Sequence, residues 1–189
     1  MRGLGTVINA FAIIAGGVLG ILFKRFLKES YQDTIIKATG FSVIFLGIAG
    51  TLSKMLHVET DGSLSTNGSM IMILSLALGA LLGEVVDLDA KFECFGAWLK
   101  HKTGSDSDNQ FVNGFVSASL TVSIGAMAVI GSIQDGIYGD YSTLIAKAIL
   151  DFIVILIMAS SLGKGCVFSF IPVAVLQGIM TALAVVLSG

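Results

Sequence analysis

Residues 142–162 read STLIAKAILDFIVILIMASSL. This stretch is almost entirely apolar, and its length matches the roughly 20 residues that an α-helix needs to cross the hydrocarbon core of a bilayer. Inside lipid every backbone polar group has to be paired within the segment, and an α-helix does this. The stretch nevertheless contains Lys147 and Asp151, and Asp151 lies well inside it. Residues 142–162 therefore predict a membrane helix that carries an ionisable pair.

The rest of the chain has the same character. Hydrophobic residues make up 54% of the 189 residues and charged residues only 13%, whereas a soluble domain carries about 25% charged residues. We therefore predict an all-α, polytopic membrane helix bundle of about six transmembrane helices, which form one transmembrane domain over residues 1–189 in a lipid bilayer. The predicted membrane helices are residues 4–23, 34–55, 68–86, 110–133, 142–162 and 166–187.

Residues 87–102 differ from these spans because they are amphipathic. Their large apolar residues share one helical face, and Trp98 adds an aromatic ring typical of the membrane interface. This pattern predicts an interfacial helix in the cytoplasmic headgroup layer. The alternative is a cytoplasmic hairpin that packs on the bundle.

The charges between the spans predict the orientation. Basic residues follow the first, third and fifth spans, the loop after the second is mixed, and the loop after the fourth is acidic. The basic residues are Lys24, Arg25, Lys28, Lys91, Lys100, Lys102 and Lys164, the mixed loop contains Lys54, His57, Glu59 and Asp61, and the acidic loop contains Asp135 and Asp140. Because basic loops stay in the cytoplasm, we expect a multi-pass protein of the bacterial cytoplasmic (inner) membrane with its N-terminus outside, although Arg2 opposes this orientation.

The spans also indicate an inverted repeat. Residues 34–55 match residues 142–162 at an offset of 110 positions, pairing Lys37 with Lys147, and the first span matches the fourth after a one-residue shift. A competing alignment pairs VINA at 7–10 with VLQG at 175–178. Either alignment relates helices of opposite direction, an arrangement common in transporters, and the sequence leaves the choice open.

Ionisable and amide side chains inside the spans are the first candidates for function. Lys147 and Asp151 are four residues apart and can pair along one helical face. The pair is either a neutralised structural lock or a cation or proton site that faces a wet cavity. Asn9 and Gln177 place amides in long apolar runs, where they join helices or line a pathway.

A second candidate is the hydroxyl-rich fourth span. Asn113, Ser117 and Thr121 recur at four-residue spacing, and Ser119 and Ser123 form a second line. Hydroxyl groups in a membrane helix form hydrogen bonds to neighbouring helices, or they line a route for a hard cation such as sodium.

The segment between the fourth and fifth spans supplies the remaining candidates. Asp140 lies just before the span at 142–162, where a carboxylate can cap free backbone N–H groups. Gln134 and Asp135 precede it. A cation-attracting mouth is one role for these two residues, and the sequence leaves their role open.

Two G-x-x-x-G spacings predict close helix crossings, and they make a homodimer plausible. They are Gly16 with Gly20 and Gly79 with Gly83. Pro172 is expected to kink the last span because it lacks a backbone donor.

Several function classes are disfavoured. The net charge of −2 gives no basic surface for nucleic acid. Cys94 and Cys166 lack ligand spacing, so we expect neither a disulfide nor a metal site. No G-x-S-x-G, H-E-x-x-H or phosphate-binding loop is found in the sequence. We therefore expect neither an enzyme nor a cofactor.

Together these residues resemble a known family. The resemblance rests on GTVINA (5–10), LSLALGALLGE (74–84), FVNGFVSASL (111–120), QDG (134–136) with GDYS (139–142), Lys147, Asp151, and IPV (171–173) with QG (177–178). These segments are similar to the YqgA-like bacterial membrane proteins, over essentially the whole chain. The resemblance implies a domain of unknown function, loosely described as a sodium channel or pump. It also implies that relatives continue past this C-terminus, so the chain is expected to be either a natural short form or a fragment. A transport site built from two repeat units would then be incomplete in this chain.

Two functions follow as hypotheses. The first is a transporter or channel for a small monovalent cation, sodium or a proton. The second is a membrane scaffold or partner subunit whose intramembrane polar groups only hold helices together, which predicts a dry bundle with every such group paired internally.

Overall fold

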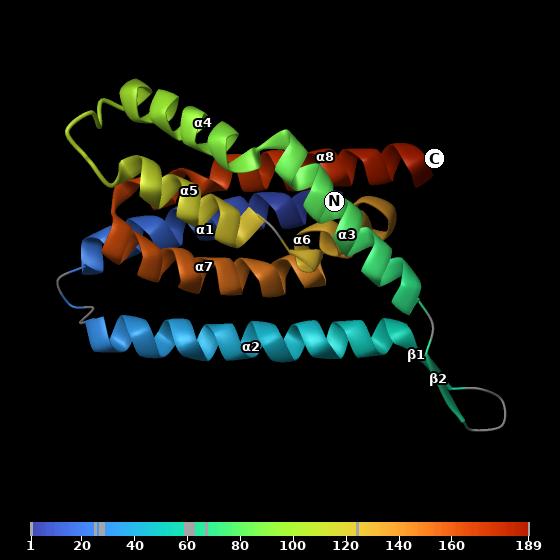
Figure 1. The fold of residues 1–189 in the computed structure, drawn as a ribbon. Coiled ribbons are helices and arrows are strands. Elements are labelled where there is room, and N and C mark those ends of the chain that lie inside the picture. The colour runs from blue at the N-terminus through green and yellow to red at the C-terminus, as the bar shows by residue number, and fades with distance from the viewer. Residues whose placement is uncertain are drawn as a thin grey trace. The chain divides into compact units, whose positions relative to one another are not determined.

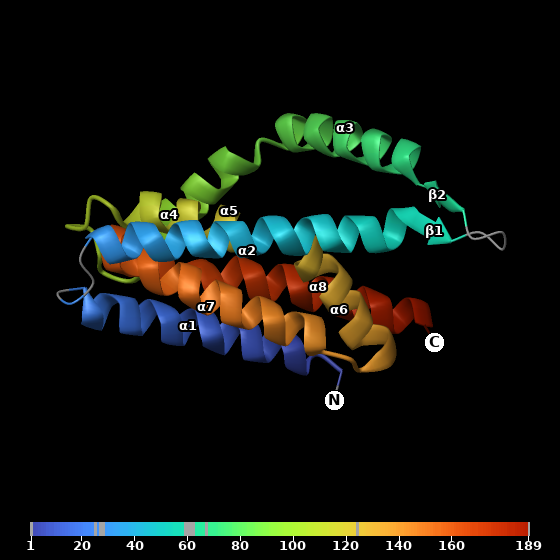
Figure 2. The same cartoon turned by 90° about the horizontal axis from the view of Figure 1, so that it is seen from below.

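The computed structural model describes residues 2–24, 26, 29–58, 63–66, 68–123 and 125–188, and its elements are shown in Figures 1 and 2. They are α1 (Leu4–Phe23), α2 (Glu29–Met55), β1 (Leu56–Val58), β2 (Leu64–Thr66), α3 (Ser69–Val86), α4 (Leu88–Lys102), α5 (Phe111–Ser123), α6 (Ala126–Tyr138), α7 (Ser142–Leu162), the 3₁₀ helix η1 (Lys164–Ser169) and α8 (Phe170–Ser188). The charged loop residues Arg25, Lys28, Glu59 and Asp61, which entered the prediction of orientation, lie outside the described residues.

The prediction of an all-α membrane bundle is confirmed. Within the described residues, α1, α3, α7 and the segment Lys164–Ser188 are long and apolar enough to cross a membrane, and α5 with α6 meets the same criterion as a bent pair. The predicted span 34–55 lies in α2, whose described apolar part, Gly40–Leu52, is shorter than a membrane span. The predicted spans 4–23 and 142–162 coincide with α1 and α7.

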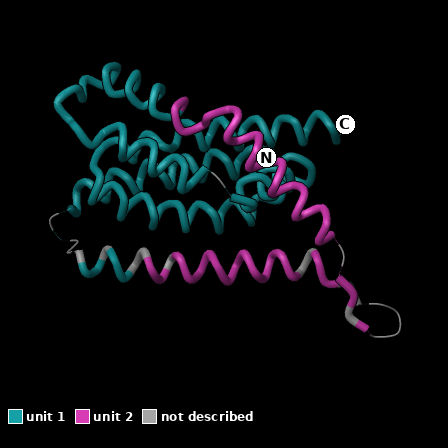
Figure 3. The backbone as a smooth tube through the Cα atoms, viewed as in Figure 1, with its two compact units in different colours: residues 1–36, 92–189 teal, residues 37–91 magenta. Residues whose placement is uncertain are grey.

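The chain divides into two compact units, which are coloured separately in Figure 3. The smaller unit is Lys37–Lys91. It holds most of α2, the strands β1 and β2, and α3. The strands pair antiparallel with Leu56 opposite Thr66. The larger unit consists of Met1–Ile36 and Phe92–Gly189, and it contains every residue discussed below as part of a site.

In the larger unit, α1 and α7 lie side by side and run in the same direction (Figures 1 and 2). A Cβ atom added at Gly16 would lie 2.5 Å from the carbonyl oxygen of Phe152, and one added at Gly20 would lie 2.2 Å from that of Leu156. Only glycine permits so close an approach of two backbones. The predicted crossing at Gly16 and Gly20 is confirmed, and it lies within one chain, so the homodimer stays a prediction.

The core of the larger unit forms where α1, α5, α7 and α8 meet. One cluster of buried residues contains Ile13, Val122, Ile155 and Val173, one from each of these helices. Near the start of α1, Thr6 lines a groove in the surface of the larger unit, and Thr181 of α8 lines the same groove. Thus α8 runs antiparallel to α1, because higher numbers on α8 lie beside lower numbers on α1.

The prediction of one continuous helix over 110–133 is wrong, because the structure has two helices there, α5 and α6, bent by 60°. Gly125 precedes α6 with extended backbone angles (φ −178°, ψ 148°). In a continuous helix the carbonyl of Val122 would accept the N–H of Ala126. Here it accepts a hydrogen bond from Nζ of Lys147 instead, at 2.8 Å. The break is therefore stabilised from outside the helix.

The amphipathic helix predicted at 87–102 corresponds to α4. Leu99 is buried in a cluster with Phe111 and Phe115, and Phe92 packs against the same cluster. The apolar face of this part of α4 therefore packs on the bundle, as the hairpin alternative expects, and placement in the headgroup layer stays a prediction.

The last predicted span, 166–187, differs from the structure at its start. It begins as η1 and continues as α8. Pro172 is the third residue of α8, where the backbone N–H of a helix has no partner within the helix. Pro172 therefore removes no hydrogen bond within α8, and the expected kink stays a prediction.

Candidate functional site

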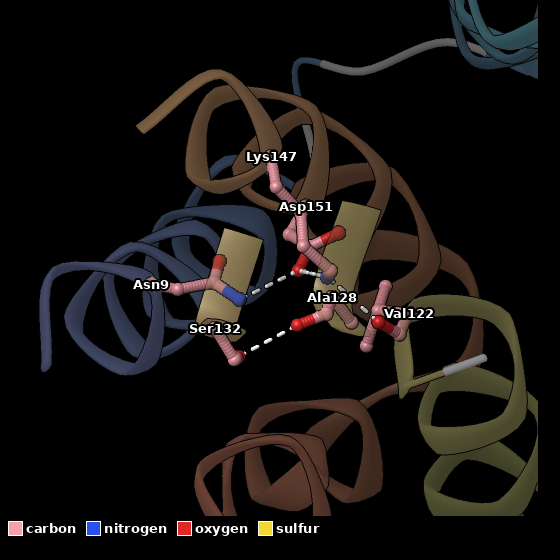
Figure 4. Close-up of polar contacts among 6 residues, drawn as sticks. All are labelled: Asn9, Val122, Ala128, Ser132, Lys147 and Asp151. Carbon is pink, nitrogen blue, oxygen red and sulfur yellow. Dashed lines mark hydrogen bonds and ion pairs between the residues drawn. The ribbon is translucent and has the colours of Figure 1, made fainter. Parts of the chain in front are cut away.

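The predicted ionisable pair is buried in the larger unit. Nζ of Lys147 donates a hydrogen bond to Oδ2 of Asp151, and Nδ2 of Asn9 donates to the same oxygen at 3.0 Å. The exposed fractions are 5% for Lys147, 6% for Asp151 and 0% for Asn9. Figure 4 shows these side chains directed at one another from α1 and α7. We call Asn9, Lys147 and Asp151 the polar centre.

The polar centre lies against the break between α5 and α6. Lys147 contacts the carbonyl of Val122 near the end of α5, and Ser132 of α6 lies nearby with its hydroxyl bonded to the carbonyl of Ala128 at 2.6 Å (Figure 4). The last carbonyls of a helix carry a partial negative charge and have no partner within the helix. The ammonium of Lys147 therefore donates to two acceptors, the Asp151 carboxylate and a partially negative carbonyl near the end of α5.

Several buried polar atoms of the larger unit have no hydrogen-bond partner among the described residues. They are Oγ1 of Thr6, Oδ1 of Asn9, Oγ of Ser119, Oγ of Ser123, Nε2 and Oε1 of Gln177, and Oγ1 of Thr181. Burying a polar group without a partner is costly, and most native proteins avoid it. Gln177 is the extreme case, since its whole amide is 0% exposed and unpaired.

Asp135 occupies a different place from the predicted one. It lies in α6 and is 0% exposed. Its carboxylate accepts the N–H of Gly3 at 3.1 Å and that of Gly5 at 3.0 Å. Gly3 has a left-handed φ of 87° and no side chain to cap α1. Because an anion at a helix N-terminus is stabilised by free N–H groups and by the helix dipole, Asp135 caps α1, and the expected cation-attracting mouth is not formed by this residue.

The remaining residues of that segment, Asp140 and Gln134, make hydrogen bonds with the first residues of α7. The predicted cap is confirmed, because Asp140 accepts the N–H of Ser142 at 3.0 Å. This hydrogen bond lowers the pKa of Asp140 below its ordinary value. Gln134 accepts a hydrogen bond from the hydroxyl of Thr143 at 2.8 Å. Neither side chain reaches the polar centre.

The hydroxyl stripe of the fourth predicted span faces outward. Asn113 and Thr121 are exposed, and Ser117 is half-buried. Ser117 bonds to Asn113, and Thr121 bonds to the carbonyl of Ser117. The second line, Ser119 and Ser123, is the buried one. The structure therefore brings the second line, and not the first, to the inner face of α5.

Thr6 and Thr181 were missed by the sequence reasoning. Each lies about one helical turn from a buried amide, Thr6 three residues before Asn9 and Thr181 four residues after Gln177. This spacing places each threonine on the same helical face as its amide, and it is the signal that could have found them. Within the described part of the chain, no group of three or more His, Cys, Asp or Glu residues could hold a metal ion.

Comparisons with known proteins identify the family of the chain. A family model described as "Protein of unknown function (DUF554)" matches residues 4–189. The "Uncharacterized membrane protein YdfK" of Bacillus subtilis (strain 168) is 30% identical over 161 residues, which are 85% of this chain and 64% of YdfK. The "Uncharacterized protein YqgA" of Escherichia coli (strain K12) is 29% identical over 178 residues, which are 92% of this chain and 71% of YqgA. The matched residues thus span about two thirds of each of these relatives. No solved structure matches.

Proposed function

This chain belongs to the DUF554 family and is a membrane protein, and from that premise we propose that it moves a small monovalent cation, sodium or a proton, across the bilayer. One observation carries the proposal. A buried carboxylate, Asp151, lies beside a broken membrane helix and among buried polar atoms that have no partner in the described residues. Ionisable groups inside a membrane mark ion pathways and proton relays.

The broken helix is the second support. In many transporters the substrate and ion sites lie where a membrane helix is interrupted, because the interruption frees backbone groups at mid-membrane depth. Here the interruption frees the carbonyl of Val122, which now contacts Lys147. The same feature places Ser123 and the start of α6 beside the polar centre.

The charges of the polar centre favour a monovalent cargo. Asp151 carries one negative charge, and Lys147 neutralises it. A cation that binds Asp151 would leave one net positive charge buried, which is strongly unfavourable. That charge is removed if Lys147 releases its proton. We therefore propose an exchange in which sodium on Asp151 and the proton on Lys147 exclude each other.

The second candidate function is a scaffold or partner subunit. It is supported by the pairing of Lys147 with Asp151 and with the carbonyl of Val122, because such a pair can serve only to hold helices together. A scaffold also requires that the other intramembrane polar groups be paired internally. Gln177, Ser119 and Ser123 do not meet this requirement. This difference favours transport.

The test is cation flux in proteoliposomes. We would compare the wild type with Asp151→Asn and use Asp106→Asn as a matched control, because Asp106 is an exposed carboxylate far from α7 in sequence. The proposal predicts flux in the wild type and the control and loss of flux in Asp151→Asn. Undiminished flux in Asp151→Asn would remove this residue from the mechanism. A folded wild type without flux of sodium or protons would favour the scaffold.

A further inference from the structure

A groove lies between the start of α1 and the last turns of α8. Its volume is about 440 Å³, and Arg2, Gly3 and Thr6 face Gly178, Thr181 and Val185 across it. Most of the lining is apolar. Thr6 and Thr181 are at least nine-tenths buried, and their hydroxyls have no partner in the described residues. The groove is therefore bordered by two threonines whose buried hydroxyls have no partner in the described residues.

The register of α1 and α8 places the two buried amides directly below this groove. Ile13 and Val173 share one core cluster, and Thr6 and Thr181 share the groove. Asn9 lies between Thr6 and Ile13 on α1, and Gln177 lies between Val173 and Thr181 on α8. Because residues three or four apart share a helical face, Asn9 and Gln177 lie at one level, between the groove and the core cluster.

The hydrogen bond to Asp151 fixes the direction of the Asn9 amide. An ionised carboxylate only accepts hydrogen bonds, so the NH₂ group of Asn9 has to face Asp151. The carbonyl oxygen Oδ1 therefore points away from the carboxylate, and it is buried without a partner. The amide of Gln177 is unpaired at both ends. Two neutral oxygens are thus available at the level between the groove and Asp151.

We propose that the groove is the entrance to Asp151 from the side of the membrane that carries the N-terminus, and that Asn9 Oδ1 and Gln177 Oε1 form a first binding site for the cation. The identity of the cargo rests on the proposed function, whereas the existence of a water-accessible route does not. Neutral carbonyl and hydroxyl oxygens suit a monovalent cation, because calcium sites recruit several carboxylates. Arg2 is exposed at the rim of the groove, and the buried Asp135 carboxylate accepts the N–H of Gly3, the next residue.

The route can be tested by cysteine accessibility, which does not depend on transport. The background variant is Cys94→Ala, because Cys94 is exposed, and Cys166 is retained because it is buried. Thr181→Cys and Thr6→Cys place thiols in the groove. Ile179→Cys is the matched control, because Ile179 lies two residues before Thr181 and is 55% exposed on the apolar outer face of α8. The probe is a cationic methanethiosulfonate applied to protein in liposomes.

A thiol reacts as the thiolate, which forms in water and is suppressed in apolar surroundings, so we expect the groove thiols to react about tenfold faster or more than the control thiol. Gln177→Cys should react at an intermediate rate, because it lies deeper. If Thr181→Cys and Thr6→Cys react no faster than Ile179→Cys, the route is overturned, even where Asp151→Asn abolishes flux. If the groove thiols react quickly and the wild type shows no flux, the route stands and the proposed cargo fails.

Discussion

We expect Gly20→Ala to push α1 away from α7 and to lower the stability of the protein. The new Cβ would lie 2.2 Å from the carbonyl oxygen of Leu156 and 3.1 Å from Cβ of Ala159, whereas ordinary contact begins at 3.4 Å. The helices would have to separate by about 1.2 Å, the difference between 3.4 Å and 2.2 Å. The atom in the way belongs to the backbone and cannot rotate aside. We therefore take about 3 kcal/mol, the upper end of overpacking costs.

Alanine also favours the helical state over glycine by about 1 kcal/mol, so the net loss of folding stability should be about 2 kcal/mol. The assay is unfolding by dodecyl sulfate in mixed micelles, followed by circular dichroism. Gly178→Ala is the matched control, because no described atom lies within 4 Å of a Cβ added there. It should be neutral or stabilise the protein. Equal effects of the two substitutions would refute the close contact between α1 and α7.

Three further predictions concern the buried charges and the helix caps. Asp151→Leu leaves the ammonium of Lys147 buried without its carboxylate and should lower the folding stability by about 3–5 kcal/mol. Adding Lys147→Met should restore most of this stability. A double variant as unstable as the single variant would contradict the pairing. Asp135→Ala removes the acceptor for two N–H groups at the start of α1 and should cost about 2–4 kcal/mol in the same unfolding assay, and Asp135→Asn, which keeps one acceptor oxygen, should cost less. Asp140 has a pKa lowered from 3.8, so its stabilisation of α7 is present above pH 3.8 and is lost as the pH falls through the lowered value. Asp140→Ala should therefore lower the melting temperature at pH 7 and lower it less in strong acid, and the same effect at both pH values would argue against the cap.

Hydropathy was sufficient to predict the helices but not the break between α5 and α6. The bounds of α1 and α7 follow from apolar runs of bilayer length that end at polar or glycine residues. The break depends on Lys147, which lies 25 residues beyond the carbonyl of Val122 that it contacts. No local pattern in 111–138 reports that contact. A hydroxyl-rich apolar run is equally compatible with a straight helix.

The candidate site could be predicted only in part, because some of its contacts also join residues that are far apart in the sequence. The pairing of Lys147 with Asp151 follows from their spacing of four residues on one helix. Asn9 could be recognised as a buried amide, but its partner lies 142 residues away. The wrong line of hydroxyls was favoured on α5 because that helix is apolar on several sides, so its rotation about its own axis is set by packing. Thr121 therefore faces outward, and Ser119 faces inward.

Because α1 and α7 run in the same direction, a short turn cannot join them, and α7 is made long after α1 during synthesis. The helix α1 leaves the ribosome first, but Asn9 finds Asp151 only after 142 further residues have been made. At about 5–20 residues per second this takes roughly 7 to 28 s. The first turn of α1 gains its partner somewhat earlier, because Asp135 lies 130 residues beyond Gly5. The polar groups at the start of α1 therefore reach their final partners only after α6 and α7 have been made.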